Sequence, residues 1–376
     1  MARTLKSDRW LFYATLLLVG LSVVMVYSAS AVPAVGRFNR TAEFFLYRQL
    51  AYAVGGFWLL FLAMRVDYHV YQRPAAIWTF AAITIVLLIA VFAWPARNGA
   101  QRWITLPFLT IQPSELAKLA MVLFAAAVLD RRMHRIGEIR YAIAPVGLAT
   151  LVFTLLIVSE PDLGTSAVLT AVVLAMLFTA GLRIWHLGLA GVLSLSAVGI
   201  LIAIEPYRWD RIVQFLEGSH QLKQSFLAIG SGGIFGLGLT GGIQKLYYLP
   251  EAHTDFIFAV IGEELGLIGT TFTLLCFLFV AWRGLRIALL APDRFGALLA
   301  VGITLMVTLQ ALVNITVVTG LAPTKGLPLP FISSGGSSLV INLVAMGILL
   351  NVSQQTLPAK VVAGDAPAWM LGESEA

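Results

Sequence analysis

Ten long apolar runs, separated by polar segments, constrain this chain more than any other feature. An α-helix needs about 20 apolar residues to cross a bilayer. Because the chain has ten runs of roughly this length, the pattern predicts an all-α integral membrane protein with ten transmembrane helices. The runs cover residues 10–27, 48–64, 76–94, 113–129, 141–159, 163–181, 187–204, 256–281, 296–319 and 338–352.

The composition supports the membrane prediction. Of the 376 residues, 59% are hydrophobic and only 12% are charged, against about 25% charged residues in an average soluble domain. A soluble protein this apolar could not cover its own surface, which disfavours a soluble enzyme, a nucleic-acid binder and a disordered scaffold. The net charge of +6 then reflects basic residues flanking the membrane.

The basic residues also orient the chain. Arg3, Lys6 and Arg9 precede the first apolar run, which is long enough to be an uncleaved first helix rather than a signal peptide. Alternating the runs places fourteen Lys and Arg residues on the cytoplasmic side and ten on the other. The clusters at 130–135 and 282–286 fit the cytoplasmic side. Both termini are therefore expected in the cytoplasm.

The domain organisation follows from the spans. Residues 1–352 form a single ten-helix transmembrane domain, and residues 353–376 form a short cytoplasmic tail that is expected to be disordered. One long extracytoplasmic loop, residues 205–255, connects the seventh and eighth spans. Loops of this length are often functional. Cys276 is the only cysteine, which excludes an intrachain disulfide and predicts a residue facing the core or lipid.

A glycine-rich segment inside this loop matches the dinucleotide-binding pattern G-x-G-x-x-G at Gly236–Gly241. It lacks the strand and the βαβ unit that this motif requires, so dinucleotide binding is rejected. Two interpretations stay open. The glycines provide flexible or tightly turned backbone, or their amides are presented to an anion.

Charged residues near the ends of spans are candidates for function because ionisable groups are costly in lipid. Glu115 and Lys118 lie three residues apart on one helical face, which predicts a structural ion pair or the wall of a polar cavity. Asp162 follows Glu160-Pro161 and either caps the next helix or contacts a substrate or metal.

A further group of charged residues surrounds the start of the eighth span. Asp255 lies at this boundary, where partial desolvation would raise the pKa of its carboxylate, as suits a general base. The alternative is that Asp255, Glu251 and Thr254 merely cap a helix. Glu263 and Glu264 lie deeper, so at least one of them must face the bundle interior and find a partner.

The last outer loop, residues 320–338, combines three prolines with a glycine–serine cluster before the tenth span. The prolines stiffen the loop. The cluster predicts an anion site at a helix N-terminus, or capping of that helix by Ser337 or Ser338.

Taken together, these segments resemble the SEDS family of bacterial peptidoglycan polymerases, which includes FtsW, RodA and SpoVE. The resemblance covers nearly the whole chain. Features at 244–253 and 323–327 look more like FtsW, whereas 230–236 looks closer to RodA, and Ser334 stands where members commonly carry tyrosine. The matching motifs are Gln101-Arg102-Trp103-Ile104, Gln112-Pro113-Ser114-Glu115, Pro161-Asp162-Leu163-Gly164-Thr165, the run from Pro250 to Phe258, and the proline–glycine–serine loop.

The resemblance implies an inverting glycosyltransferase that polymerises lipid II on the outer face of the bacterial cytoplasmic membrane, for septal or lateral wall synthesis. Asp255 matches the family's essential aspartate and is the expected base. The predicted substrate-binding residues are Arg102, Glu115, Lys118, Arg208, Arg211, Lys245, Glu251, His253, Ser333, Ser337 and Ser338, with Lys223 as a further candidate for phosphate contact. Asp162, Glu263 and Glu264 are expected to be structural or to line the cavity.

The resemblance also implies partners. A class B penicillin-binding protein, lipid II and membrane proteins of the divisome or elongasome are expected, and nucleic acid is not. A divalent cation, Mg²⁺ or Mn²⁺, is the one cofactor considered. Two other functions remain as alternatives: a lipid II flippase that uses the intramembrane charges, and a non-catalytic scaffold of a cell-wall synthase complex.

Overall fold

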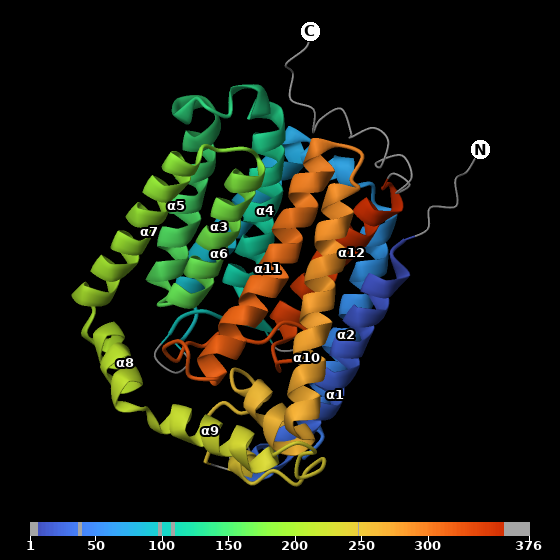
Figure 1. Cartoon of the computed structure of the whole chain (residues 1–376), viewed down its shortest axis with the longest axis vertical. Helices are drawn as coiled ribbons and strands as arrows, with labels where there is room; N and C mark the ends of the chain where they lie inside the picture. The colour runs from blue at the N-terminus through green and yellow to red at the C-terminus, as the bar shows by residue number, and fades with distance from the viewer. Residues whose placement is uncertain (1–6, 37–39, 97–99, 107–109, 247, 357–376) are drawn as a thin grey trace.

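A computed structural model describes residues 7–36, 40–96, 100–106, 110–246 and 248–356. Within them the chain is almost entirely helical (Figure 1). The first eight predicted runs correspond to α1 (Arg9–Gly36), α2 (Phe44–Arg65), α3 (Pro74–Ala90), α4 (Pro113–Arg132), α5 (Ala144–Ser159), α6 (Leu163–Thr179), α7 (Ile184–Ile204) and α10 (Ile257–Leu289). The last two correspond to α11 (Arg294–Val318) and α12 (Gly336–Gln354).

By length and composition, seven helical segments of the described residues are sufficient to cross a membrane: α1, α2, α3 extended to Ala93, α7, α10, α11 and α12. Two more, α5 and α6, are apolar but shorter. The remaining helix, α4, carries charges at both ends, including Glu115 and Arg132. The ten predicted runs are thus ten helices, while the ten-span topology itself stays a prediction.

The long loop is more structured than the sequence suggested. It contains α8 (Pro206–Glu217), α9 (His220–Gly232) and the 3-10 turn η5 (Gln244–Leu246). Ser219 caps α9 by accepting a hydrogen bond from the Leu222 amide at 3.2 Å. In Figure 1, α7, α8 and α9 form a bent arm along one side of the bundle. None of the residues of α7 or α8 is buried, so these two helices pack loosely, whereas α9 is anchored by buried residues that include Leu222 and Ala228.

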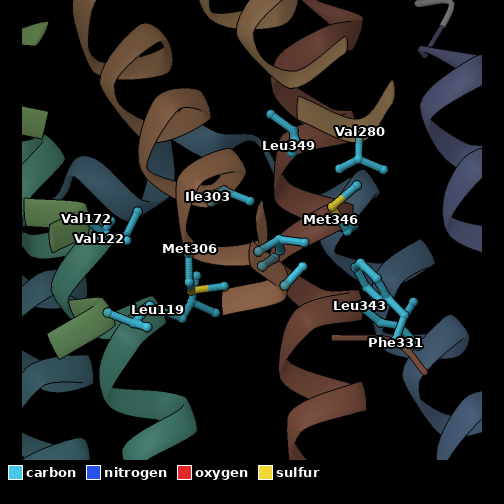
Figure 2. Packing of buried hydrophobic residues seen from close by; sticks show 14 of the residues in the cluster. Leu119, Val122, Val172, Val280, Ile303, Met306, Phe331, Leu343, Met346 and Leu349 are labelled. Atoms are coloured by element: carbon cyan, nitrogen blue, oxygen red, sulfur yellow. The ribbon is translucent and has the colours of Figure 1, made fainter. Parts of the chain in front are cut away.

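The core is centred on α11, which packs against α4, α6, α10 and α12 (Figure 2). Small residues allow close helix approach, as is usual where lipid removes the hydrophobic drive for association. A Cβ on Gly284 of α10 would lie 2.1 Å from the Thr304 hydroxyl of α11, and one on Gly347 of α12 would lie 2.5 Å from the Leu60 carbonyl of α2. Cys276 is buried, as predicted.

The glycine-rich segment fills a break in α10. Gly266 interrupts this helix with φ 65° and ψ −159°, a conformation that requires glycine. The backbone groups freed by the break bond to the segment: Leu237 and Gly238 donate to the carbonyls of Glu263 and Glu264, both at 3.0 Å. The interpretation of tightly turned backbone is therefore confirmed, and the segment is a fixed packing element.

Four smaller 3-10 or π turns and a two-stranded hairpin complete the described elements. The turns are η1 (Tyr68–Gln72), η2 (Val91–Ala93), η3 (Met133–Arg135) and η4 (Ile139–Ile143). The strands β1 (Ile104–Thr105) and β2 (Thr110–Ile111) pair antiparallel, with Ile104 opposite Ile111. This hairpin sets Arg102 beside the turn between α5 and α6. The tail was predicted to begin at residue 353, but α12 continues to Gln354, and the part of the tail after residue 356 lies outside the described residues.

Candidate functional site

A large open cavity of about 2760 Å³ lies at the end of the bundle that carries α8 and α9. Its walls come from α2, the β1–β2 region, the α5–α6 turn, α8, the segment before α10 and the loop before α12. Six Lys and Arg residues line it against four Asp and Glu residues, so the lining is net positive. The basic residues are Arg40, Arg48, Arg102, Arg208, Arg211 and Lys325, and the acidic ones are Glu205, Asp210, Glu251 and Asp255.

Asp255 lines this cavity directly before α10. Its side chain does not cap the helix, because the N-cap of α10 is Phe256 and carries no side-chain cap bond. The capping alternative is therefore wrong. Burial and, to a smaller extent, the nearby charge of Glu251 raise the pKa of Asp255 to about 7, against the opposing effect of Arg102. A carboxyl with this pKa is poised to accept a proton near neutral pH.

Two surrounding segments hold the backbone around Asp255 in place. The side-chain amide of Asn314, on α11, donates to the Asp255 carbonyl at 2.8 Å and to the Leu327 carbonyl at 2.7 Å. The Ser333 hydroxyl donates to the Thr254 carbonyl at 2.6 Å, and the Ser334 amide donates to the His253 carbonyl at 2.9 Å. The segment that carries Asp255 is thus held by the outer loop and α11 together.

Arg102 faces the same point from the other side. Its Nε donates to the Glu160 carbonyl at 3.0 Å, and one terminal nitrogen donates to the Pro161 carbonyl. A Cβ built on Gly326 would lie 3.1 Å from Asp255 Oδ2 and 3.8 Å from the other terminal nitrogen of Arg102. The glycine therefore lets the carboxylate and the guanidinium approach one another beside the loop backbone.

The other predicted cations divide into two sets. Arg208 and Arg211 line the cavity from α8, where they donate to the carbonyls of Leu201 and Thr324 at 2.9 and 3.5 Å. Lys223 is exposed and does not line the cavity. Lys245 is buried, and its ammonium bonds to Glu264 and to the Ser28 hydroxyl, so it is not available to a phosphate.

Lys325, like Arg40 and Arg48, is a cavity cation that the sequence analysis did not select. Burial and the nearby charge of Arg211 lower its pKa, while Asp162 opposes this. The sequence signal for Lys325 was its position within the proline-rich outer loop. Its basic character alone did not single it out, because the chain has 25 Lys and Arg residues.

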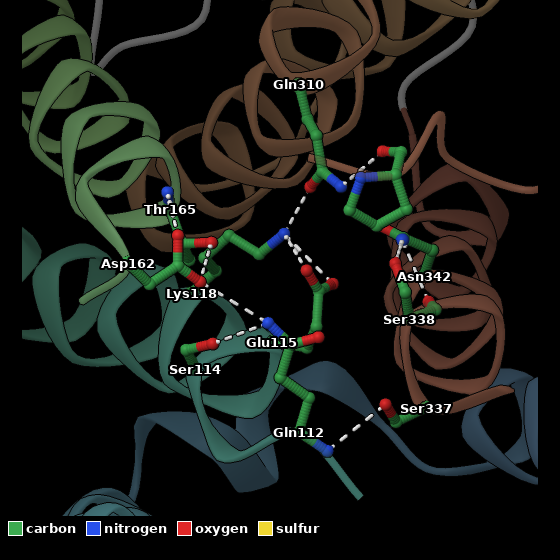
Figure 3. Close-up of polar contacts among 11 residues, drawn as sticks. Gln112, Ser114, Glu115, Lys118, Asp162, Thr165, Gln310, Ser337, Ser338 and Asn342 are labelled. Carbon is green, nitrogen blue, oxygen red and sulfur yellow. Dashed lines mark hydrogen bonds and ion pairs between the residues drawn. The ribbon is translucent and has the colours of Figure 1, made fainter. Parts of the chain in front are cut away.

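The buried charges of the bundle are paired structurally. Glu115 and Lys118 form an ion pair at 3.0 Å, and Lys118 also bonds to Gln310 of α11 (Figure 3). Neither residue of the pair lines the cavity. Glu263 accepts hydrogen bonds from the backbone amides of Ile243 and Gln244 at 2.7 and 3.0 Å. The anion bound by these amides, which follow the glycine-rich segment, is therefore a carboxylate of the protein itself.

Asp162 caps α6, as one interpretation predicted. It accepts from the Thr165 amide at 3.1 Å and from the Thr165 hydroxyl at 2.8 Å (Figure 3). By contrast, capping of α12 by serine is wrong, because its N-cap is Gly335. The hydroxyl of Ser337 instead accepts from the Gln112 amide at 3.2 Å, and Ser338 bonds to Asn342. Both serines still line the cavity, as do Glu251 and His253, whereas Ser333 lies behind it.

Within the described residues, no three His, Cys, Asp or Glu side chains are grouped as metal ligands. The two acids that line the cavity beside one another, Asp255 and Glu251, are coupled electrostatically. They do not provide a protein-only cage for a cation.

Comparison with known proteins places the chain in a family. The model for FtsW, RodA and SpoVE, described as cell cycle proteins, matches residues 8–357. A probable peptidoglycan glycosyltransferase FtsW from Geobacter sp. is 42% identical over 94% of this chain and 98% of its own length. Stage V sporulation protein E of Bacillus subtilis is 43% identical over 93% of this chain and 97% of its own.

Solved structures agree with the sequence comparison. Rod shape determining protein RodA of Thermus thermophilus is 29% identical, with a TM-score of 0.69 over 94% of this chain and 99% of that one. A chain of a peptidoglycan synthase complex that coordinates polymerization and crosslinking is 27% identical, with a TM-score of 0.75 over 93% of this chain and 98% of that one. The higher identities to the FtsW and SpoVE relatives support the FtsW-like branch. The chain is a multi-pass membrane protein that belongs to the FtsW/RodA/SpoVE family of cell cycle proteins.

Proposed function

We propose that this chain is a peptidoglycan glycosyltransferase that polymerises lipid II into glycan strands. The observation that carries the proposal is the Asp255 carboxyl, with a pKa of about 7, beside Arg102 in a net-positive cavity. The name of a relative points the same way, since the Geobacter protein is a probable peptidoglycan glycosyltransferase.

The chemistry follows from this arrangement. Asp255 takes the proton of the acceptor sugar hydroxyl as that oxygen attacks the anomeric carbon of the donor. The bond from the anomeric carbon to the pyrophosphate oxygen breaks, and the lipid pyrophosphate leaves with the bonding electrons. Arg102, Arg208, Arg211 and Lys325 stabilise the negative charge that develops on it. A single displacement with one base inverts the anomeric configuration, as conversion of an α-linked donor to a β-linked product requires.

The topology that we propose places the reaction outside the cell. Ten helices cross the bacterial cytoplasmic membrane with both termini in the cytoplasm, and the cavity opens on the extracytoplasmic face. The clusters of arginine at 131–135 and 283–286 support this orientation. Insertion of a cysteine at exposed Glu217 and at exposed Arg73, followed by labelling of intact cells, tests it. Labelling at residue 217 and not at residue 73 is expected, and the reverse pattern contradicts the orientation.

A class B penicillin-binding protein is the proposed partner, with divisome or elongasome membrane proteins. The similarity to a chain of a complex that couples polymerization to crosslinking supports this partner. We place a divalent cation, Mg²⁺ or Mn²⁺, only at the donor pyrophosphate, since Mg²⁺ often uses one or two carboxylates together with substrate phosphates. Residues Asp255 and Glu251 are the acids within reach of such a cation.

Polymerisation by the purified protein tests the proposal. The chain is mixed with its cognate penicillin-binding protein and lipid II, and glycan strands are resolved by gel electrophoresis. Asp255→Ala is expected to abolish strand formation while the melting temperature is retained. The matched control is Glu217→Ala, an exposed acid on α8 that does not line the cavity and should leave the rate unchanged.

The same assay separates the alternatives. A flippase would move lipid II across vesicles without polymerising it, and a scaffold would do neither. The buried pairs disfavour the flippase, because Glu115–Lys118 and Lys245–Glu264 bond to protein groups and do not line the cavity. Normal polymerisation by Asp255→Ala would show that the base lies elsewhere.

A further inference from the structure

A second cavity, of about 570 Å³, lies at the opposite end of the bundle, beside the first and last described residues, Ser7 and Thr356. Here α1 begins and α10 and α12 end. Its volume is within the usual range for small-molecule sites, about 300–1,000 Å³. The glycosyltransferase proposal makes no use of this cavity. The lining residues are Ser7, Asp8, Arg9, Trp10, Arg283, Arg286, Ile287, Leu290, Ser353 and Thr356.

The single acid in this lining is fully engaged by the protein. One oxygen of Asp8 accepts from the Leu11 amide at 3.1 Å and so caps the first turn of α1. The other accepts from Arg283 Nε at 2.9 Å. The Asp8 amide in turn donates to the Ser353 hydroxyl at 3.0 Å, which ties the start of α1 to the end of α12.

Two arginines in the lining have no such acid. Arg9 and Arg286 are exposed, and neither forms an ion pair within the part of the chain that the structure describes. With Arg283 balanced by Asp8, the cavity keeps two unbalanced positive charges. A guanidinium binds phosphate oxygens in a bidentate geometry. The cavity is therefore suited to a phosphate-bearing anion.

The surface below the cavity is apolar on both adjoining helices. Trp10 and Trp282 are 65% and 54% exposed, in the position that tryptophan favours at a membrane–water interface. Exposed apolar side chains continue from them along the helices, away from the cavity. On α1 they are Tyr13 and Leu17, and on α10 they are Leu278 and Leu275.

We propose that this cavity binds the phosphate headgroup of an anionic phospholipid of the cytoplasmic leaflet. Arg9 and Arg286 hold the phosphodiester, and the acyl chains lie against the exposed stripes of α1 and α10. The two unbalanced positive charges favour binding of an anion. The adjoining apolar surface favours a lipid over a soluble phosphate, because only a lipid has acyl chains that contact this surface. The site is far from Asp255 and independent of the glycosyltransferase reaction.

Lipid binding to the purified full chain tests the proposal. Native mass spectrometry measures the affinity for dioleoyl-phosphatidylglycerol and for dioleoyl-phosphatidylcholine, first for the wild type. Each arginine near an anionic headgroup contributes about 1 kcal/mol, so R9Q/R286Q is expected to bind phosphatidylglycerol roughly 30-fold more weakly. Neither side chain has a structural ion pair, so the melting temperature without lipid should be unchanged.

The matched control is R65Q/R73Q, which removes the same charge from two exposed arginines on the same predicted side but outside the cavity. It should leave phosphatidylglycerol binding within about twofold of the wild type, since screening and distance weaken its effect. An equal loss in both double variants, or equal binding of phosphatidylcholine by the wild type, overturns the proposal.

Inorganic phosphate separates the two sources of the ligand. Millimolar phosphate should displace little phosphatidylglycerol, because it lacks the acyl chains that contact α1 and α10. If phosphate displaced all of the bound phosphatidylglycerol, and R9Q/R286Q abolished this competition, the lipid assignment would be overturned in favour of a soluble phosphate.

Discussion

The side-chain amide of Asn314 donates a hydrogen bond of 2.8 Å to the backbone carbonyl of Asp255. The same amide holds the Leu327 carbonyl at 2.7 Å, so one residue of α11 joins the segment that carries the base to the loop that faces it. Asn314 is almost fully buried and does not line the cavity. It therefore acts as a positioning residue.

Asn314→Leu should slow polymerisation by roughly 10- to 100-fold, because a displacement of about 1 Å in a reacting group can cost 100-fold. The loss should fall on kcat rather than on KM, since the cations that bind the donor are untouched. Steady-state kinetics with lipid II measures both constants. Gln310→Leu removes the equivalent amide one turn earlier on α11 and should leave kcat less affected, because Gln310 bonds to Lys118 and to the Pro328 carbonyl and not to the segment that carries Asp255.

Charge changes around Asp255 should move the pH dependence in opposite directions. With the pKa of Asp255 at about 7, the wild-type rate should fall about tenfold per pH unit below that value as the base becomes protonated. Arg102→Met removes a cation that lowers this pKa, so its midpoint should move to higher pH. Glu251→Gln removes an anion that raises it, so its midpoint should move to lower pH.

The pH–rate profiles of the two variants, measured under single-turnover conditions, check this prediction. Their opposite displacement distinguishes electrostatic coupling from a general loss of structure. Shifts in the same direction would show that another group controls the profile.

Asp255 should also affect stability. Its folded pKa lies above the value of 3.8 for an unperturbed aspartate, so the folded state binds more protons between these two values. The contribution of Asp255 to the stability of the folded protein therefore decreases as pH rises from about 4 to 7. Asp255→Asn should raise the melting temperature at pH 8 and change it little at pH 4. A lower melting temperature at pH 8 would contradict the raised pKa.

Gly266→Ala should destabilise the protein strongly. The added Cβ would lie 2.4 Å from the Gly236 amide nitrogen, and φ 65° with ψ −159° is a glycine conformation. The backbone strain alone is of order 1–3 kcal/mol. Thermal unfolding in detergent measures the change. Gly188→Ala on α7 is the control, since nothing lies within 4 Å of the added atom and it should be neutral or stabilising.

Lys118→Met should lower the stability of the protein more than replacement of both members of its ion pair does. The single change leaves Glu115 buried without its cation, which costs about 3–5 kcal/mol. The double variant Glu115→Leu/Lys118→Met removes both charges and should recover most of that loss. A double-mutant cycle of melting temperatures tests the coupling, and additive effects would show that the pair does not act as a unit.

The helical segments, and the position of Asp255 at a helix boundary, are predictable from the sequence alone. The ten apolar runs coincide with ten helices, because the length and hydropathy of a segment are local properties of the chain. Asp162 was identified as a possible cap from its place before Leu163, and Asp255 from its place at a helix boundary and from the family motif. The Glu115–Lys118 pair followed from spacing on a helix.

Which charged residues contact one another depends on the packing of the helices. Lys245 and Lys325 are both cations of outer segments, yet Lys245 bonds to Glu264 inside the bundle while Lys325 lines the cavity. Asn314 reaches Asp255 across 59 positions of sequence. A residue's own sequence neighbourhood carries no record of such long-range partners, because they depend on how the helices pack. The kink at Gly266, which brings the glycine-rich segment against α10, is decided by that same packing.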